Sequence, residues 1–271
     1  MALSAHASRW LIAAVAAPLL LAVIFLAPPL FFFLVVAVFG ALAWWEFHDI
    51  CLGESGPWLR AAGLAGWLLT AAGAHFFGPA GQQAGLVLAV AGGGLYFIFR
   101  YPQIENVMDQ AGRFALGHAY ISLFFSFLLL LFALDRGPRW ILFTLLVTFL
   151  GDACAFYVGR TLGRRPLYPA VSPKKTWEGL AGGVAGSGLT AAALGLVLAP
   201  AAWWETGLLG LFLGGWAAAG DLFESMLKRA AGVKDSGHIL LGHGGVWDRV
   251  DALLFNVPAV YFFALFRGGL G

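Results

Sequence analysis

Polar residues that could bind a cation or a phosphate gather in the second half of the sequence. One face of a helix would carry four of them at i, i+3, i+4 and i+7, namely Asp221, Glu224, Ser225 and Lys228. Farther on, Asp248 and Asp251 are three residues apart and can share the face of another helix. Carboxylates on neighbouring helices form an oxygen-rich ligand set, which a hard cation such as Mg²⁺ prefers.

Two polar stretches beside these carboxylates have the residue types that handle phosphate. The first runs from Lys228 to Arg249 and combines basic residues, carboxylates and the run Gly242-His243-Gly244-Gly245. Glycines let backbone N–H groups approach phosphate oxygens, and Lys and Arg neutralise them. The second, Ser172–Glu178, contains Pro173, which predicts a turn, and then presents donors just before a helix. Helix N-termini favour anions, so both stretches predict phosphate contacts. No GxxxxGK[ST] motif is present, which excludes a P-loop.

The composition places these groups in a membrane protein. Of the 271 residues, 61% are apolar and 11% are charged, against about 45–50% and about 25% in a soluble domain. A chain this apolar predicts an all-α polytopic membrane protein. A net charge of +2 is too small to indicate nucleic acid as a partner.

Nine apolar segments approach the roughly 20 residues that a membrane-spanning helix needs. The predicted spans are 9–27, 30–47, 59–77, 82–99, 117–134, 140–159, 179–200, 206–227 and 250–267. The first lacks an obvious small-residue cleavage site, so it is expected to be a span and not a signal peptide. Residues 1–135 form an N-terminal region of about five spans. Residues 136–271 form a catalytic region with polar loops at 160–178 and 228–249.

Basic residues predict the orientation of these spans. With nine spans, 13 of the 16 Lys and Arg residues fall on the side of the N-terminus and three on the other. Basic loops stay in the cytoplasm, so we expect a cytoplasmic N-terminus, an outside C-terminus and both polar loops facing the cytoplasm.

Charged residues inside the predicted spans separate the two regions. Asp152 lies well inside the sixth span, where a charge costs roughly 2.5–3.5 kcal/mol and usually marks a site or pathway. The first five spans and their edges hold several polar residues but no cluster, and these are interpreted as packing or interfacial residues: Glu46, His48, Asp49, His75 and His118.

The polar loops resemble the signature of the phosphatidate cytidylyltransferase family, the CDP-diacylglycerol synthases. The resemblance lies in Ser225-x-Leu-Lys-Arg-x4-Lys234-Asp235-x-Gly237 and the following His243-Gly-Gly-x-x-Asp248-Arg249-x-Asp251. The stretch 172–179 and the pair Gly220-Asp221 are similar to the family as well. One departure is Leu241, where the family pattern usually has a small or turn-forming residue.

This resemblance implies transfer of CMP from CTP to phosphatidate, giving CDP-diacylglycerol and pyrophosphate. It implies Mg²⁺, with a second cation left open, a homodimer, and a multi-pass protein of the bacterial cytoplasmic membrane. The expected metal ligands are Asp221 and Asp248, with Asp251 and Asp152 in support. The expected phosphate-binding residues are Lys175, Lys228, Arg229, Lys234 and Arg249. Hydrogen-bond donors are expected at Ser172, Thr176 and Ser225, and His243, Gly244 and Gly245 would shape the nucleotide loop. Three roles stay open for Asp235: orienting Lys234, contacting the nucleoside, or binding metal.

Other functions remain as alternatives. A CTP-dependent lipid kinase would transfer the γ-phosphoryl group and release CDP. A transporter with intramembrane carboxylates is a weaker alternative, because the charges cluster in one half of the chain and not in two matching halves. A CDP-alcohol phosphatidyltransferase is disfavoured, because the sequence has no Asp-Gly pair.

Overall fold

The computed structural model describes residues 17–198, 201–237 and 244–268, and almost all of them are helical. Residues 17–25 are helical and precede the labelled elements. The helices are α2 (Pro29–Cys51), α3 (Pro57–Arg100), α4 (Val107–Gly117), α5 (Leu123–Ala133), α6 (Gly137–Leu162), α7 (Trp177–Gly195), α8 (Trp203–Ala230) and α9 (Trp247–Gly268). Two 3₁₀ turns (Gly53–Ser55 and Tyr101–Gln103) flank α3, and a π-helical turn (His118–Ser122) joins α4 to α5. Proline in the first turn begins α2, α3 and α6, where a missing N–H costs nothing.

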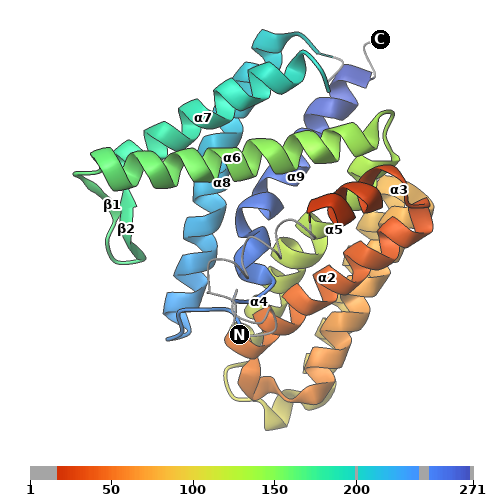
Figure 1. Ribbon diagram of the computed structural model, residues 1–271. Coiled ribbons are helices and arrows are strands. Elements are labelled where there is room, and N and C mark those ends of the chain that lie inside the picture. Colours follow the sequence, from red (N-terminus) through yellow and green to blue (C-terminus); the bar gives the residue numbers. More distant parts are fainter. Residues whose placement is uncertain (1–16, 199–200, 238–243, 269–271) are drawn as a thin grey trace, which may run out of the picture.

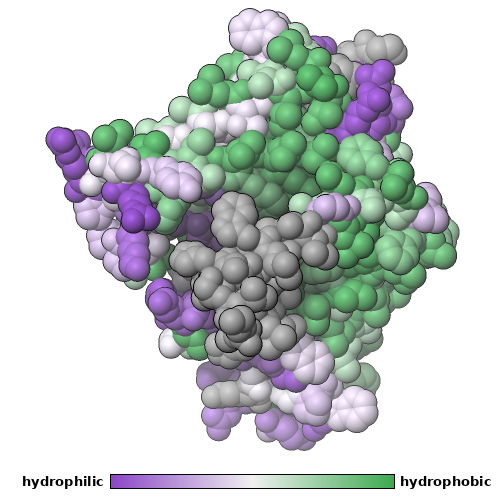
Figure 2. Space-filling model, in the orientation of Figure 1, coloured by the Kyte–Doolittle hydropathy of each residue, from purple (hydrophilic) through white to green (hydrophobic). Residues whose placement is uncertain are grey.

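Six helices of the described residues are long and apolar enough to cross a membrane. The outer surface suits lipid: Phe99 is 80% exposed and Leu26 81% exposed, and hydrophobic side chains cover broad areas of the face in Figure 2. The chain is therefore an all-α membrane protein, as the composition predicts. The predicted count of nine spans stays a prediction.

Helix α3 reverses its direction near the middle, which explains part of the difference between the six candidate spans of the structure and the nine predicted spans. Gly78 has φ 65° and ψ −150°, which is not helical, and glycine adopts such a conformation without steric cost. A Cβ on Gly85 would lie 2.6 Å from the carbonyl oxygen of Leu69, so the segments before and after Gly78 pack against each other. The two halves of α3 correspond to the predicted spans 59–77 and 82–99.

The predicted loop 160–178 contains a structure that the sequence did not suggest. Strands β1 (Pro166–Tyr168) and β2 (Ser172–Thr176) pair antiparallel in a two-stranded sheet, which projects from one end of α6 (Figure 1). Pro173 lies inside β2, so the turn predicted at this proline is wrong. A two-stranded sheet has only edge strands, and these tolerate proline because one side of each strand needs no N–H donor.

The hydrophobic core crosses the predicted boundary at residue 135. Helix α9 packs against α2, α5, α6 and α8. Trp44 and Phe47 of α2 and Trp247 of α9 are fully buried in the same cluster, and the rings of Phe47 and Trp247 are 5.4 Å apart. The N-terminal region therefore packs directly against the helix that carries Asp248 and Asp251.

Small residues bring α6, α7 and α8 close together. Gly183 of α7 faces Ala155 of α6, where a Cβ would lie 2.9 Å from the Ala155 Cβ. Gly214 of α8 faces α7, where a Cβ would lie 2.7 Å from the Val184 Cα. Close backbone approach through small residues is a common packing mode of helices in membranes. It sets the spacing of the three helices that enclose the cavity described below.

Gly214 and its neighbour Gly215 provide a matched test of this packing. A Cβ on Gly215 meets nothing within 4 Å. We expect Gly214→Ala to lower the free energy of unfolding in detergent by about 1–3 kcal/mol through overpacking. Gly215→Ala should leave it unchanged or raise it by up to about 1 kcal/mol. Equal effects of the two substitutions would contradict the close α7–α8 contact.

Candidate active site

A cavity of about 660 Å³ lies between α6, α7, α8, the β-hairpin and the start of α9. Eight of the predicted site residues line it: Asp152, Lys175, Thr176, Asp221, Ser225, Lys228, Asp248 and Asp251. Glu224, which the sequence analysis grouped with Asp221 on one helical face, lines it as well. So do Arg160 and Lys174, to which the sequence analysis assigned no role. The two predicted loops meet beside it, where Arg229 Nε donates to the Val171 carbonyl oxygen at 3.4 Å.

Three carboxylates form an acidic cluster in this cavity: Asp221 and Glu224 of α8 and Asp251 of α9. One oxygen of each lies within 4.8 Å of the others. Glu224 is only 1% exposed, and its Oε1 atom has no hydrogen-bond partner. An unpartnered carboxylate oxygen is costly when buried, and a cation would relieve that cost. Glu224 stands three residues after Asp221, so the helical spacing that predicted a shared face also predicted this pair.

Lys228 connects the acidic cluster to the first turn of α9. Its Nζ atom lies 2.7 Å from Glu224 Oε2 and 2.7 Å from Asp248 Oδ1. The lysine is buried, with 8% exposure. Because one ammonium group bonds to carboxylates of both α8 and α9, it fixes the two helices relative to each other.

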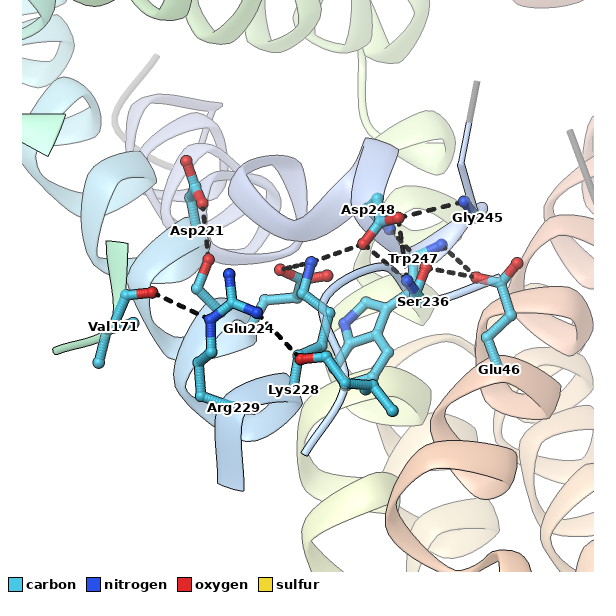
Figure 3. A network of polar contacts seen from close by, with 12 residues as sticks. Glu46, Val171, Asp221, Glu224, Lys228, Arg229, Ser236, Gly245, Trp247 and Asp248 are labelled. Atoms are coloured by element: carbon cyan, nitrogen blue, oxygen red, sulfur yellow. Dashed lines mark hydrogen bonds and ion pairs between the residues drawn. The ribbon is translucent and has the colours of Figure 1, made fainter. Parts of the chain in front are cut away.

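Asp248 differs in its surroundings from the acidic cluster. Besides Lys228, its carboxylate accepts the backbone N–H of Ser236, at 3.1 Å, and the backbone N–H of Gly245, at 3.2 Å. Gly244 has φ +79°, and a Cβ there would lie 2.9 Å from Asp248 Oδ2, so glycine suits this turn in both conformation and space. Of the four predicted metal ligands, Asp221 and Asp251 lie in the cluster and Asp152 lines the same cavity, whereas protein donors surround Asp248 (Figure 3).

The stretch Ser172–Glu178, the second one predicted to contact phosphate, contributes Lys174, Lys175 and Thr176 to the cavity lining. Lys175 forms an ion pair with Asp221, and Ser225 Oγ donates to the same carboxylate at 3.4 Å. Thr176 caps α7, because its Oγ1 accepts the Gly179 N–H at 3.1 Å. At the outer edge, the backbone N–H groups of Arg164 and Arg165 donate to Glu178. These hydrogen bonds hold the pKa of Glu178 below its ordinary value.

The other predicted site residues that the structure describes are not among those that line the cavity. Ser172 is half-buried in β2, and Lys234, Asp235 and Arg249 are exposed. Gly245 uses its N–H on Asp248. His243 and Leu241 lie outside the described residues.

The sequence analysis missed one residue that contacts the start of α9. Glu46 of α2 is 2% exposed, and its carboxylate accepts the N–H of Val246 at 2.9 Å and that of Trp247 at 2.7 Å. The sequence analysis interpreted it as a packing or interfacial residue. A glutamate between Trp45 and Phe47 inside an apolar helix was the available signal, but its partners lie 200 residues away.

The chain is similar to one protein family and to several curated proteins. Residues 7–266 match the model of the cytidylyltransferase family. The chain is 41% identical over 156 residues to a phosphatidate cytidylyltransferase of Bacillus subtilis, covering 57% of this chain and 58% of that protein. It is 48% identical over 130 residues to the protein of the same name from Synechocystis, covering 45% and 44%. A Mycobacterium tuberculosis protein of that name is 34% identical over 161 residues, covering 59% and 49%. The chain thus spans about half the length of these curated relatives.

Removing the central ammonium group tests the electrostatics of the site. Lys228→Met would leave Glu224 and Asp248 without their shared cation, so we expect the free energy of unfolding to fall by about 3–5 kcal/mol. Denaturant unfolding of purified protein in mixed micelles measures this. Lys174→Met at an exposed position of the same cavity should change it by less than about 0.5 kcal/mol. Equal losses would mean that the buried pairs do not stabilise the fold.

Proposed function

The chain belongs to the cytidylyltransferase family, and we propose that it transfers CMP from CTP to phosphatidate, producing CDP-diacylglycerol and pyrophosphate. The observation that carries this proposal is the cavity between α6, α7, α8 and the start of α9, where three carboxylates lie beside Lys175 and Lys228. Such a site can hold a metal-bound polyphosphate next to a lipid head group. Relatives named phosphatidate cytidylyltransferase are 41% and 48% identical to this chain over 156 and 130 residues, which supports the same reaction.

The chain is a multi-pass membrane protein, and we place it in the bacterial cytoplasmic membrane. Nine spans with the N-terminus in the cytoplasm and the C-terminus outside would put both polar loops, and hence the mouth of the cavity, on the cytoplasmic side. The distribution of 13 of 16 basic residues to that side supports this orientation. CTP is available there. A homodimer is the proposed assembly, on the family resemblance.

The acidic cluster fits Mg²⁺ as the cofactor. Its donors are carboxylate oxygens, which Mg²⁺ prefers, and Glu224, one of the three residues, has an Oε1 atom with no hydrogen-bond partner. Asp221, Glu224 and Asp251 would hold the ion, and Asp152, which lines the same cavity, would be available to a second cation. When bound, the metal would neutralise the phosphate charges that the reaction concentrates on the leaving pyrophosphate.

The reaction needs positioning more than proton transfer. A phosphatidate oxygen attacks the α-phosphorus of CTP in line, the new P–O bond forms, and the bond to the β-phosphate breaks to release pyrophosphate. The attacking phosphate is already an anion at neutral pH, so no strong base is required. Catalysis therefore depends on orientation and charge neutralisation.

The cavity residues divide these tasks. Lys175 sits beside the acidic cluster, where its ammonium group can bind a phosphate that bridges to the metal. Thr176 and Ser225 supply hydroxyl groups on the cavity wall, and Lys174 and Arg160 add positive charge near the hairpin. Lys228 holds Glu224 and Asp248 in place and is the basic residue nearest to both. Arg229 in the last turn of α8, Lys234 in the segment that follows it and Arg249 in the first turn of α9 would bind phosphates of the nucleotide.

The wall of the cavity gives phosphatidate a route from the bilayer. Phe156 of α6 lines the cavity and is 59% exposed. This exposed apolar side chain marks the part of the lining where the cavity would open toward lipid. The lipid can therefore present its phosphate to the cavity while its acyl chains stay in the hydrocarbon region.

The position of the transferred phosphorus tests this function. Purified protein with phosphatidate, Mg²⁺ and CTP labelled at the α-phosphorus should move label into lipid and release an equal amount of pyrophosphate, and EDTA should stop both. Label in soluble CDP, with phosphate gained by the lipid, would identify a CTP-dependent kinase instead. No consumption of CTP would contradict both enzymes and favour transport.

Asp221→Asn tests the acidic cluster directly. The substitution removes a ligand charge but little volume, so we expect folding to be retained and the rate to fall by at least about 100-fold. The matched control is Asp109→Asn, which removes an exposed carboxylate paired with Arg113 on α4. Its rate should stay at the wild-type level. Normal turnover by Asp221→Asn would exclude this carboxylate from the site.

A further inference from the structure

Glu46 lies at the junction between the N-terminal region and the start of α9. Its Oε1 atom accepts the Val246 N–H, and its Oε2 atom accepts the Trp247 N–H and the Ser236 hydroxyl, the last at 3.2 Å. The Val246 and Trp247 N–H groups stand at the start of α9, where a helix has unpaired N–H groups and a positive dipole end. Glu46 therefore serves as a capping carboxylate for a helix distant in the sequence.

Close backbone approach makes this contact possible. A Cβ on Gly245 would lie 2.5 Å from Glu46 Oε2, and a Cβ on Gly237 would lie 3.0 Å from Oε1. The loop before α9 thus surrounds the carboxylate with backbone on two sides. Trp247 is held on its other side as well, since its Nε1 donates to Tyr120 OH at 3.4 Å and its ring packs on Phe47.

Hydrogen bonds connect Glu46 to the acidic cluster in four steps, drawn in Figure 3. Ser236 donates its hydroxyl to Glu46 and its backbone N–H to Asp248. The Asp248 N–H in turn donates to Ser236 Oγ at 3.3 Å. Asp248 pairs with Lys228, and Lys228 pairs with Glu224. Each link is a charged or charge-assisted contact away from bulk water, where such bonds are strong and directional.

We propose that Glu46 is a positioning residue for the active site, which sets the first turn of α9 and thereby the placement of Asp248 and Asp251. This role rests on the proposed function, because it assumes that the acidic cluster binds the metal. Glu46 touches neither the cavity nor the cluster, so it acts only through Ser236, Val246 and Trp247. Residues that orient metal-binding groups from outside typically change metal affinity or activity by about 10–100-fold when they are altered.

Glu46→Gln tests the inference with little change of shape. The amide can accept from one backbone N–H, but its NH₂ group cannot accept from the other. Two readouts use the full-length protein in detergent without turnover. Hydrogen–deuterium exchange should accelerate in peptides covering 244–250 and stay unchanged in those covering the β-hairpin. Binding of Mn²⁺, followed by electron paramagnetic resonance as a probe of the Mg²⁺ site, should weaken by about 10-fold.

Glu105→Gln is the matched control, because it removes one carboxylate from an exposed position between α3 and α4. Exchange and Mn²⁺ binding should both stay at wild-type values. A merely structural role for Glu46 predicts faster exchange throughout the protein and unchanged Mn²⁺ affinity of the folded fraction. That result, or wild-type behaviour in both readouts, would overturn the proposal.

Ser236→Ala keeps the test decisive if Glu46→Gln does not accumulate as folded protein. It removes the hydroxyl between Glu46 and Asp248 and leaves both backbone donors on Glu46. Ser236→Ala should weaken the binding of Mn²⁺. An unchanged affinity for Mn²⁺ would overturn the proposal. Should the wild-type protein bind no Mn²⁺, the proposed function fails on that point, while local exchange at 244–250 still decides whether Glu46 holds α9.

Discussion

The ammonium group of Lys228, shared between Glu224 and Asp248, is the interaction on which the site depends. Both carboxylates lie on helices apolar enough to span a membrane, where an unpaired charge is expensive. A single cation 2.7 Å from each offsets that cost and joins α8 to α9. The geometry of the acidic cluster follows, because Asp221 and Glu224 belong to one of these helices and Asp251 belongs to the other.

This electrostatic link requires helices that approach closely and do not slide. Glycines at the α6–α7–α8 contacts allow the approach, and van der Waals packing can then hold the helices without a hydrophobic driving force from lipid. At the end opposite Lys228, Arg267 of α9 forms an ion pair with Glu205 in the first turn of α8. Helices α8 and α9 are thus tied by opposite charges near both ends.

Local spacing made part of this arrangement predictable. The i, i+3, i+4 and i+7 pattern of α8 reports one helical face directly, so Asp221, Glu224, Ser225 and Lys228 could be grouped from the sequence. The break at Gly78 and the polar loops were readable from residue types in the same way. Contacts between distant segments could not be predicted from the sequence. Nothing near Glu46 indicates that its partners are Val246 and Trp247, and nothing near Asp248 indicates that backbone N–H groups will occupy its oxygens. The strand that contains Pro173 has no alternating burial, so its sequence offered no period-2 signal against the turn tendency of proline.

The carboxylates of this region fall into two sets with different chemistry. Glu46 and Asp248 each accept backbone N–H groups from the loop before α9, and Asp248 also accepts Lys228. If either carboxylate turned toward a cation, it would lose hydrogen bonds from buried donors, at a cost of about 1–3 kcal/mol for each donor left unpaired. Glu224 has an oxygen that accepts nothing, and its carboxylate lies beside those of Asp221 and Asp251, so Glu224 can bind a cation without giving up its contact with Lys228. The protein thus satisfies Glu46 and Asp248 with backbone donors to build the site and leaves one oxygen of Glu224 open in the acidic cluster, and this cluster is the better cation ligand.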